Sequence, residues 1–415
     1  MILYSIGIAV YQFFVRLFSL WNRKAKKMIE GRANIFSELE VFKSKNINNK
    51  IIWFHAASLG EFEQGRPLIE VIKNQYQDYK ILLSFFSPSG YEMRKNYPFA
   101  DHICYLPFDT KKNAEKFVSI LNPDVVVFIK YEFWLRLINE LKKKNIPVYL
   151  ISAVFHKNQP FFKWYGTIFR SSLPNYEKIF LQDDSSAKLL SNLNLKNFSV
   201  TGDSRFDRVI EIAQEKFSDE KIRAFCENKS LIIGGSTYDE EENMLAEFFV
   251  KNKSKFPEIR LIIAPHELNE SSINRIEKTL KKNNLSYIRY TENKISNTDV
   301  IILDTMGMLS GVYRFGSIAV IGGGFNDGIH STIEASVYGL PVLFGPNHLK
   351  FKEAKEMLEL GAAFSFENSN QLNLHLNQLI IDKSFYQNAS LSAANYIKEN
   401  SGATKKILGE IKLIL

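Results

Sequence analysis

The chain has only two cysteines, Cys104 and Cys226, among its 415 residues. Two thiols cannot build a disulfide framework or a cysteine-based zinc module, and their scarcity suits a reducing compartment. With 21 glycines and 12 prolines, the composition excludes collagen-like and low-complexity chains. What remains is an ordinary globular composition, 45% hydrophobic and 24% charged, in a chain long enough for two domains.

Several familiar site motifs are also absent. The sequence contains no G-x-x-x-x-G-K-[ST] phosphate loop, no G-x-G-x-x-G dinucleotide fingerprint, no H-E-x-x-H and no Asp-x-Asp pair. We therefore expect neither a bound cofactor nor a metal ion.

The balance of charge is basic. Lysine and arginine number 53 against 45 acidic residues, a net charge of +8, which favours a polyanionic partner or a membrane surface. A nucleic-acid surface would need cations interleaved with aromatic residues, and no such tract is present. We expect a membrane partner and no nucleic acid.

The N-terminal segment points the same way. Residues 1–21 are mostly apolar, interrupted by Gln12 and Arg16, and would form a helix of about 30 Å, roughly one hydrocarbon thickness. Four cations follow the apolar stretch, the reverse of a secretory signal: Arg23, Lys24, Lys26 and Lys27. We expect residues 1–32 to be a membrane-associated helix with a basic flank, inserted or interfacial, and the body to be cytoplasmic. A helix packed in the core is the alternative.

The rest of the chain has the pattern of parallel α/β sheets. Short apolar runs alternate with amphipathic stretches roughly every 20 to 30 residues. Most runs are continuous, as strands buried on both faces require. The expected strands are 51–54, 81–86, 102–108, 125–129, 148–152, 179–182, 199–202, 231–235, 261–265, 287–290, 300–304, 318–322 and 342–345.

A polar, charged stretch at 204–229 separates the two series of strands. We expect two doubly wound, Rossmann-like domains at 33–215 and 216–415, with the carboxyl ends of both sheets on a shared cleft. The last residues, about 384–415, are expected to be helices that cap or recross the domains.

A carboxylate follows the first expected strand, in His55-Ala-Ala-Ser-Leu-Gly-Glu61. Gly60 would allow close backbone approach or a positive φ, and Glu61 would lie in the first helical turn, where the macrodipole favours an ionised carboxylate. Such a group can accept a proton late in a reaction with a good leaving group. Alternatively, Glu61 is only a first-turn helix charge and His55 a turn residue.

Two further turns carry candidate ligand residues. In Gly234-Gly235-Ser236-Thr237, the hydroxyls can cap the next helix or donate to a phosphate, and a plain capped helix is the alternative. The second runs from Asp304-Thr-Met-Gly307 through a strand to Gly322-Gly-Gly324 and a helix carrying Glu334, whose side chain can accept hydrogen bonds from ribose. An ordinary βα turn is the alternative there.

The order of these motifs resembles that of the bacterial 3-deoxy-D-manno-octulosonic acid (Kdo) transferases, which glycosylate the lipid A precursor in lipopolysaccharide synthesis. The resemblance covers nearly the whole chain. Its motifs are Gly31-Arg32, His55-Ala-Ala-Ser-Leu-Gly-Glu61, Ser87-Pro-Ser-Gly90, Tyr105-Leu-Pro-Phe-Asp109, Lys130-Tyr-Glu-Phe-Trp134, Gly202-Asp-Ser-Arg-Phe-Asp207, Gly235-Ser-Thr237, Pro265-His-Glu267, Asp304-Thr-Met-Gly307 and Gly339-Leu-Pro-Val-Leu-Phe-Gly-Pro346.

The resemblance implies an α/β protein of the GT-B fold: an inverting glycosyltransferase that uses CMP-Kdo, requires no metal and acts at the cytoplasmic face of the inner membrane on lipid IVA. It makes Glu61 the catalytic base and places Ser58, Gly60, Arg66 and Glu132 in substrate binding. It assigns CMP binding to Ser236, Thr237, His266, Met306, Gly307, Gly324, His330, Ser331 and Glu334.

Two departures from the family pattern affect the phosphate contacts. Pro265 stands where the family commonly has Arg, and the helix start reads His330-Ser-Thr-Ile-Glu334 in place of His-Asn-Pro-Leu-Glu. Two other functions remain open. One is a GT-B transferase that uses a UDP- or GDP-sugar, and the other is a noncatalytic membrane-associated binding protein on the same scaffold.

Overall fold

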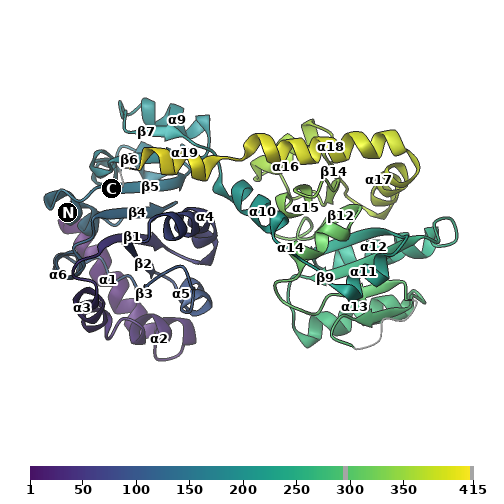
Figure 1. Cartoon of the computed structure of the whole chain (residues 1–415), viewed down its shortest axis with the longest axis horizontal. Coiled ribbons are helices and arrows are strands. Elements are labelled where there is room, and N and C mark those ends of the chain that lie inside the picture. The colour runs from purple at the N-terminus through teal and green to yellow at the C-terminus, as the bar shows by residue number, and fades with distance from the viewer. Residues whose placement is uncertain (293–297, 412–415) are drawn as a thin grey trace. The chain divides into compact units, whose positions relative to one another are not determined.

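The computed structural model describes residues 1–292 and 298–411. The chain divides into two compact units (Figure 1). The first contains Met1–Arg208 and the chain from Ser401 on, and the second contains Val209–Asn400. Each is built on a seven-stranded sheet.

The first unit has a parallel sheet with the strand order β3-β2-β1-β4-β5-β6-β7. Its strands are β1 (Lys50–Ala56), β2 (Tyr79–Phe85), β3 (His102–Tyr105), β4 (Val125–Ile129), β5 (Val148–Ala153), β6 (Lys178–Leu181) and β7 (Phe198–Val200). Its helices are α1 (Ile2–Phe18), α2 (Arg23–Glu30), α3 (Ile35–Lys45), α4 (Leu59–Gln75), α5 (Pro88–Arg94), α6 (Lys111–Leu121), α7 (Leu135–Lys143), η1 (Pro160–Phe162), α8 (Thr167–Arg170), η2 (Leu173–Asn175), α9 (Asp184–Ser191) and α19 (Ala403–Glu410).

The second unit repeats this plan with the order β10-β11-β9-β8-β12-β13-β14, again parallel. Its strands are β8 (Ser230–Thr237), β9 (Ile259–Pro265), β10 (Tyr287–Arg289), β11 (Val300–Ile302), β12 (Ile318–Ile321), β13 (Val342–Phe344) and β14 (Ala363–Ser365). Its helices are α11 (Glu220–Cys226), α12 (Asp239–Asn252), α13 (Glu270–Lys282), α14 (Leu309–Val312), η3 (Tyr313–Phe315), α15 (Ile333–Ser336), α16 (Lys352–Glu359), α17 (Ser369–Ile381) and α18 (Lys383–Asn400); α10 (Ser204–Gln214) runs from the first unit into the second.

The strands form where the sequence has continuous apolar runs. All five residues of β4 are buried, as are six of the seven residues of β1, because helices cover both faces of the sheet. Close packing needs a glycine at position 65: a Cβ on Gly65 of α4 would lie 2.2 Å from the Cδ1 atom of Ile129. This contact fixes α4 against β4 and so positions the residues at the start of the helix.

The α/β class and the GT-B fold with two Rossmann-like units are confirmed, and each of the thirteen expected runs overlaps a strand. A fourteenth strand, β14, was not expected. The boundary also differs from the predicted one: the units divide between Arg208 and Val209, and the polar stretch at 204–229 contains α10 and α11.

The C-terminal segment returns to the first unit. In α19, Ile407 is buried in the core of that unit, Glu410 is paired with Lys178, and the backbone N–H of Gly402 donates to Asp207 at 2.5 Å. The prediction of terminal helices that recross the domains therefore holds for α19, although the segment had been grouped with residues 216–415.

Helix α1 has one face on the first unit and one face in solvent. Tyr4 donates to the Asp109 carboxylate, the Tyr11 ring lies 6.1 Å from the rings of Phe86 and Phe108, and Val15 is buried. The other face exposes large apolar side chains: Ile2, Leu3, Ile6, Val10, Phe13, Phe14, Leu17 and Phe18. Among the described helices, none is by itself long and apolar enough to cross a bilayer, whereas α1 and α2 together, bent by 119°, would meet that criterion.

Candidate active site

The catalytic candidate Glu61 lies at the carboxyl edge of the first sheet. Strand β1 ends at Ala56, Ser58 caps α4, and Glu61 occupies the first turn of that helix. Its carboxylate is partly exposed and accepts a hydrogen bond from the Ser58 hydroxyl. Its place in the first helical turn and its partial exposure leave the Glu61 carboxylate open to a substrate.

Gly60 does not have a positive φ. It lies within α4, its φ is outside the left-handed region, and a Cβ there would meet only the Ser58 Oγ atom at 3.9 Å. The turn is made by Ala57 and Ser58 before the helix begins, so the close approach that Gly60 allows is not used within the protein.

Two residues at this edge were missed by the sequence reasoning. Tyr131 follows β4 and Asp183 follows β6, so parallel topology carries both to the edge where Glu61 lies. Partial burial raises the pKa of the Tyr131 hydroxyl, and the carboxylates of Glu61 and Asp183 raise it further. Tyr131 is therefore a protonated hydroxyl that interacts electrostatically with two acids. The register of the strands, visible only in the fold, brings them together.

Glu132 lies beneath this edge with its side chain buried. The Oε2 atom is 2.9 Å from Nε2 of His55 and also accepts from the indole of Trp134, while the backbone carbonyl accepts from Tyr176 at 2.6 Å. The other ring nitrogen of His55 lies 2.9 Å from the Ser84 hydroxyl. Glu132 thus holds β1 and the segment after β4 together.

Arg66, predicted to bind substrate, is engaged within its own helix. Its guanidinium pairs with Glu70 at 2.7 Å and with Glu63 at 3.5 Å, and it lies over the Tyr97 ring. These carboxylates raise its pKa against the opposing effect of burial, so the cation is firmly held. The structure does not bring Arg66 into contact with Glu61.

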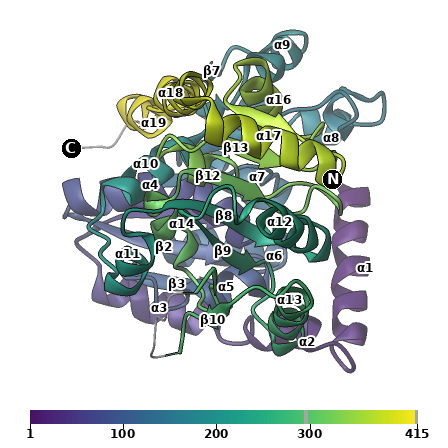
Figure 2. The same cartoon turned by 90° about the vertical axis from the view of Figure 1, so that its right-hand side faces the viewer.

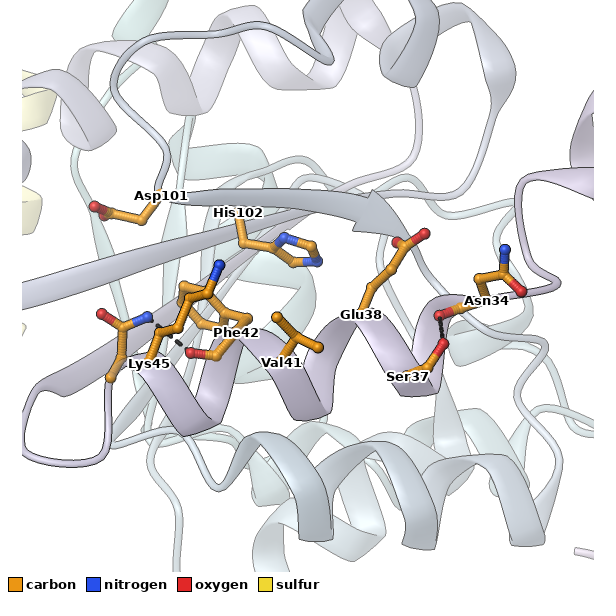
Figure 3. A pocket seen from close by; sticks show the side chains of 9 residues that line it. Asn34, Ser37, Glu38, Val41, Phe42, Lys45, Asp101 and His102 are labelled. Atoms are coloured by element: carbon orange, nitrogen blue, oxygen red, sulfur yellow. Dashed lines mark hydrogen bonds between the residues drawn. The ribbon is translucent and has the colours of Figure 1, made fainter.

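A separate pocket of 480 Å³ lies between α3 and the start of β3, where Glu38 and His102 project into it (Figure 3). His102 is the first residue of its strand, so this pocket lies at the amino edge of the sheet. Glu61 and the other predicted residues lie elsewhere, at or beyond the carboxyl edge.

In the second unit, glycines let the loops at the carboxyl edge approach one another. A Cβ on Gly322 would lie 2.1 Å from the carbonyl oxygen of Ser236, and a Cβ on Gly324 would lie 2.4 Å from the nitrogen of Gly345. Ser236 itself has a φ of 53°. The loops after β8, β12 and β13 are therefore in backbone contact.

A buried carboxylate joins two of these loops. Glu241 of α12 accepts from the backbone N–H of Tyr238 at 3.1 Å and from that of Gly323 at 2.9 Å, and it is fully buried. Burial raises its pKa, while these donors oppose the rise. Tyr238 is the N-cap of α12, so of the two roles left open for Ser236 and Thr237 the structure excludes capping of this helix.

The predicted donor residues divide into two groups. Thr237 is fully buried, and its hydroxyl donates to Glu242 at 3.1 Å, which in turn pairs with Arg275. The rings of His266 and His330 stack with centroids 4.2 Å apart, and Tyr238 stacks on both. The first group is structural, whereas the three rings form a partly exposed aromatic surface.

The remaining donor candidates lie on neighbouring loops. Met306 is 75% exposed and Gly307 has a φ of 81°, both after β11. Glu334, in the single turn of α15 after Ser331, accepts a hydrogen bond from Ser310 of α14. Glu334 is partly exposed, so its carboxylate can accept hydrogen bonds from a ligand.

Burial lowers the pKa of His330 to about 4, and the neighbouring His266 contributes to the shift. The ring is therefore neutral at pH 7 and can stack on or hydrogen-bond to a ligand without carrying charge. Among the described residues, no group of three or more His, Cys, Asp or Glu side chains is placed to hold a metal ion.

Comparison with known proteins shows what the chain resembles. Residues 30–208 match the family model of 3-deoxy-D-manno-octulosonic-acid transferase (kdotransferase). The Aquifex aeolicus 3-deoxy-D-manno-octulosonic acid transferase is 28% identical over 332 residues, which cover 79% of this chain and 86% of that protein. The chain is therefore similar to Kdo transferases over most of its length, and its first unit matches their family model.

Other similarities of the chain concern length and fold. It is 26% identical to a bifunctional glycosyltransferase/methyltransferase of Fusobacterium nucleatum over 99% of this chain, but spans only 64% of that protein. The UDP-GlcNAc 2-epimerase of Neisseria meningitidis superposes with a TM-score of 0.62 at 17% identity, covering 87% of this chain and 98% of that one. That likeness shows the fold alone.

Proposed function

We propose that this protein transfers Kdo from CMP-Kdo to the lipid A precursor, lipid IVA, with inversion at the anomeric carbon and with Glu61 as the general base. The observation that carries the proposal is the partly exposed Glu61 carboxylate at the start of α4, in the unit that matches the Kdo transferase model.

The reaction is a single displacement. The oxygen of the acceptor's primary hydroxyl forms a bond to the anomeric carbon as the bond from that carbon to the CMP phosphate breaks. The acceptor proton passes to Glu61, and CMP leaves as a phosphate monoester that needs no protein acid. Glu61 gives up its proton to solvent before the next cycle.

Two other residues near Glu61 have supporting roles in this proposal. The Ser58 hydroxyl holds the Glu61 carboxylate through a hydrogen bond. Tyr131 keeps its proton at neutral pH and can donate to an acceptor oxygen. Both residues would orient the base and the nucleophile.

The CMP moiety is proposed to bind the second unit. The rings of Tyr238, His266 and His330 offer a stacking surface, and Glu334 can accept hydrogen bonds from ribose hydroxyls. The exposed apolar face of α1 and the basic flank that follows are proposed to hold the protein on the cytoplasmic face of the inner membrane.

The test is incubation of the full chain with CMP-Kdo and tetraacyl lipid A precursor, reading the product by mass. An added Kdo residue and released CMP are expected. No product with CMP-Kdo, together with thermal protection by UDP or GDP but not by CMP, would indicate a different sugar nucleotide. CMP binding without any transfer would indicate a binding protein.

A further inference from the structure

An apolar groove runs beside α1 in the first unit. A cavity of about 870 Å³ lies between the first two turns of α1 and residues 165–169, where the N-terminus lies next to α8 (Figure 2). Ile2, Leu3 and Ile8 line it from one side and Ile168 and Phe169 from the other. None of the described residues that line it has a charged side chain, and its size is that of a ligand pocket.

The groove continues toward the carboxyl edge of the sheet. A second cavity of about 390 Å³ shares Tyr4, Ile8 and Phe169 with the first and is also lined by Tyr131 and Trp134. Tyr131 interacts electrostatically with Glu61. Together the two cavities form what we call the α1 groove. The α1 groove therefore connects an exposed apolar helix face with the surroundings of the proposed base, Glu61.

The charge of the groove wall restricts what it can hold. Residues 155–176 contain the cations Lys157, Lys163 and Arg170 and no aspartate or glutamate. The tip of this segment exposes Trp164 to 90%, a side chain suited to the boundary between water and lipid. Glu132 also lines the second cavity, where its carboxylate contacts His55 and Trp134. A mainly apolar channel with cations in the segment that forms one wall fits an anionic amphiphile.

We propose that the α1 groove binds a fatty-acyl chain of the acceptor, so that the chain directs the glucosamine hydroxyl toward Glu61. This rests on the proposed function, because it assigns to the acceptor of that reaction a binding site of its own. The groove then contributes to acceptor selection in addition to any attachment of α1 to a membrane.

The experiment uses soluble acceptors in place of a bilayer. Glucosamine disaccharides that carry one acyl chain of four, six or eight carbons are assayed with CMP-Kdo and the full chain, below their aggregation concentrations and without detergent. If the chain is buried in the groove, kcat/KM should rise by up to about fourfold for each added methylene.

Gly7→Leu fills the groove. Gly7 lines the larger cavity, and a Cβ there has no atom within 4 Å, so α1 can accept the side chain. The rise in kcat/KM from four to eight carbons should fall from tens of fold to less than threefold. Ala9→Leu adds a similar side chain to an exposed position of α1 that lines neither cavity, and it should keep the full rise.

The outcomes separate the two proposals. Three results would contradict acyl-chain binding in the groove and leave the proposed transfer reaction unaffected. They are equal kcat/KM at all chain lengths, an unchanged rise in kcat/KM in Gly7→Leu, and an equal loss of that rise in both variants. Weaker binding of Gly7→Leu to anionic phospholipid vesicles with an unchanged rise would assign the groove to bilayer lipid instead. If no acceptor of any length receives Kdo, the proposed function fails and this inference fails with it.

Discussion

The buried contact between Glu132 and His55 offers a quantitative test of how the first unit holds its site. Glu132→Ala removes the carboxylate that lies 2.9 Å from His55 and accepts from Trp134. One buried donor left without a partner costs about 1–3 kcal/mol, and the lost burial of one methylene adds about 0.8 kcal/mol. We expect the free energy of unfolding of this unit to fall by about 2–4 kcal/mol.

Tryptophan fluorescence can measure this loss in the first unit alone. The four tryptophans are Trp21, Trp53, Trp134 and Trp164, all within Met1–Arg208. With a urea m-value of about 2–3 kcal/mol/M, the midpoint of unfolding should fall by about 1–2 M. Glu132→Gln keeps an acceptor oxygen, so its midpoint of unfolding should fall by less than that of Glu132→Ala.

The matched control is Glu115→Ala in the same unit. The Glu115 side chain is 46% exposed, and its carboxylate is 3.8 Å from the ammonium group of Lys111, a surface pair worth well under 1 kcal/mol. Its midpoint should stay nearly constant. Equal midpoints for Glu132→Ala and Glu115→Ala would refute the reasoning, because they would mean that the buried contact contributes nothing.

Three further predictions concern other parts of the chain. In an NMR titration, the His330 ring should titrate with a midpoint of about pH 4, and its signal should vanish in His330→Gln. Because this pKa is lower than in the unfolded chain, the neutral His330 ring stabilises the fold above about pH 6.5. This contribution to the free energy of unfolding is lost as the pH falls toward 4. A midpoint above 6 would contradict the burial argument. Gly322→Ala should lower the thermal midpoint of the second unit by several degrees and weaken CMP binding, because its Cβ would lie 2.1 Å from the Ser236 carbonyl oxygen. Gly409→Ala, where a Cβ has no atom within 4 Å, should change neither property. An unchanged thermal midpoint and unchanged CMP binding in Gly322→Ala would disprove the contact. Deleting residues 1–21 should reduce transfer to membrane-embedded acceptor more than transfer to detergent-dispersed acceptor, whereas equal losses would count against a membrane role for α1.

The strands were predictable because each is a local signal. Thirteen short apolar runs identified thirteen strands, and most of these runs are continuous because burial on both faces leaves no polar alternation. Strand β14 has three residues, two of them only partly buried, and has no such run. The return of α19 to the first unit depends on long-range contacts such as that between Glu410 and Lys178, which no local pattern encodes.

The candidate site was only partly predictable for the same reason. Glu61 follows its strand within a short motif, so the sequence alone identified it. Tyr131 and Asp183 act through their position on neighbouring strands, and the burial of Glu132 against His55 joins residues 77 apart in sequence. The ordinary sequence around Glu241 likewise gives no sign that its carboxylate joins two loops.

The role of Glu61 is tested most directly by Glu61→Gln, assayed for transfer from CMP-Kdo to the lipid A precursor. The amide keeps the shape and can still accept a hydrogen bond from Ser58, but it cannot take the acceptor proton. Transfer should fall at least about a hundredfold, while CMP-Kdo binding and the unfolding midpoint remain those of the unaltered protein. Transfer within a fewfold of the unaltered rate would contradict the assignment of Glu61 as the base.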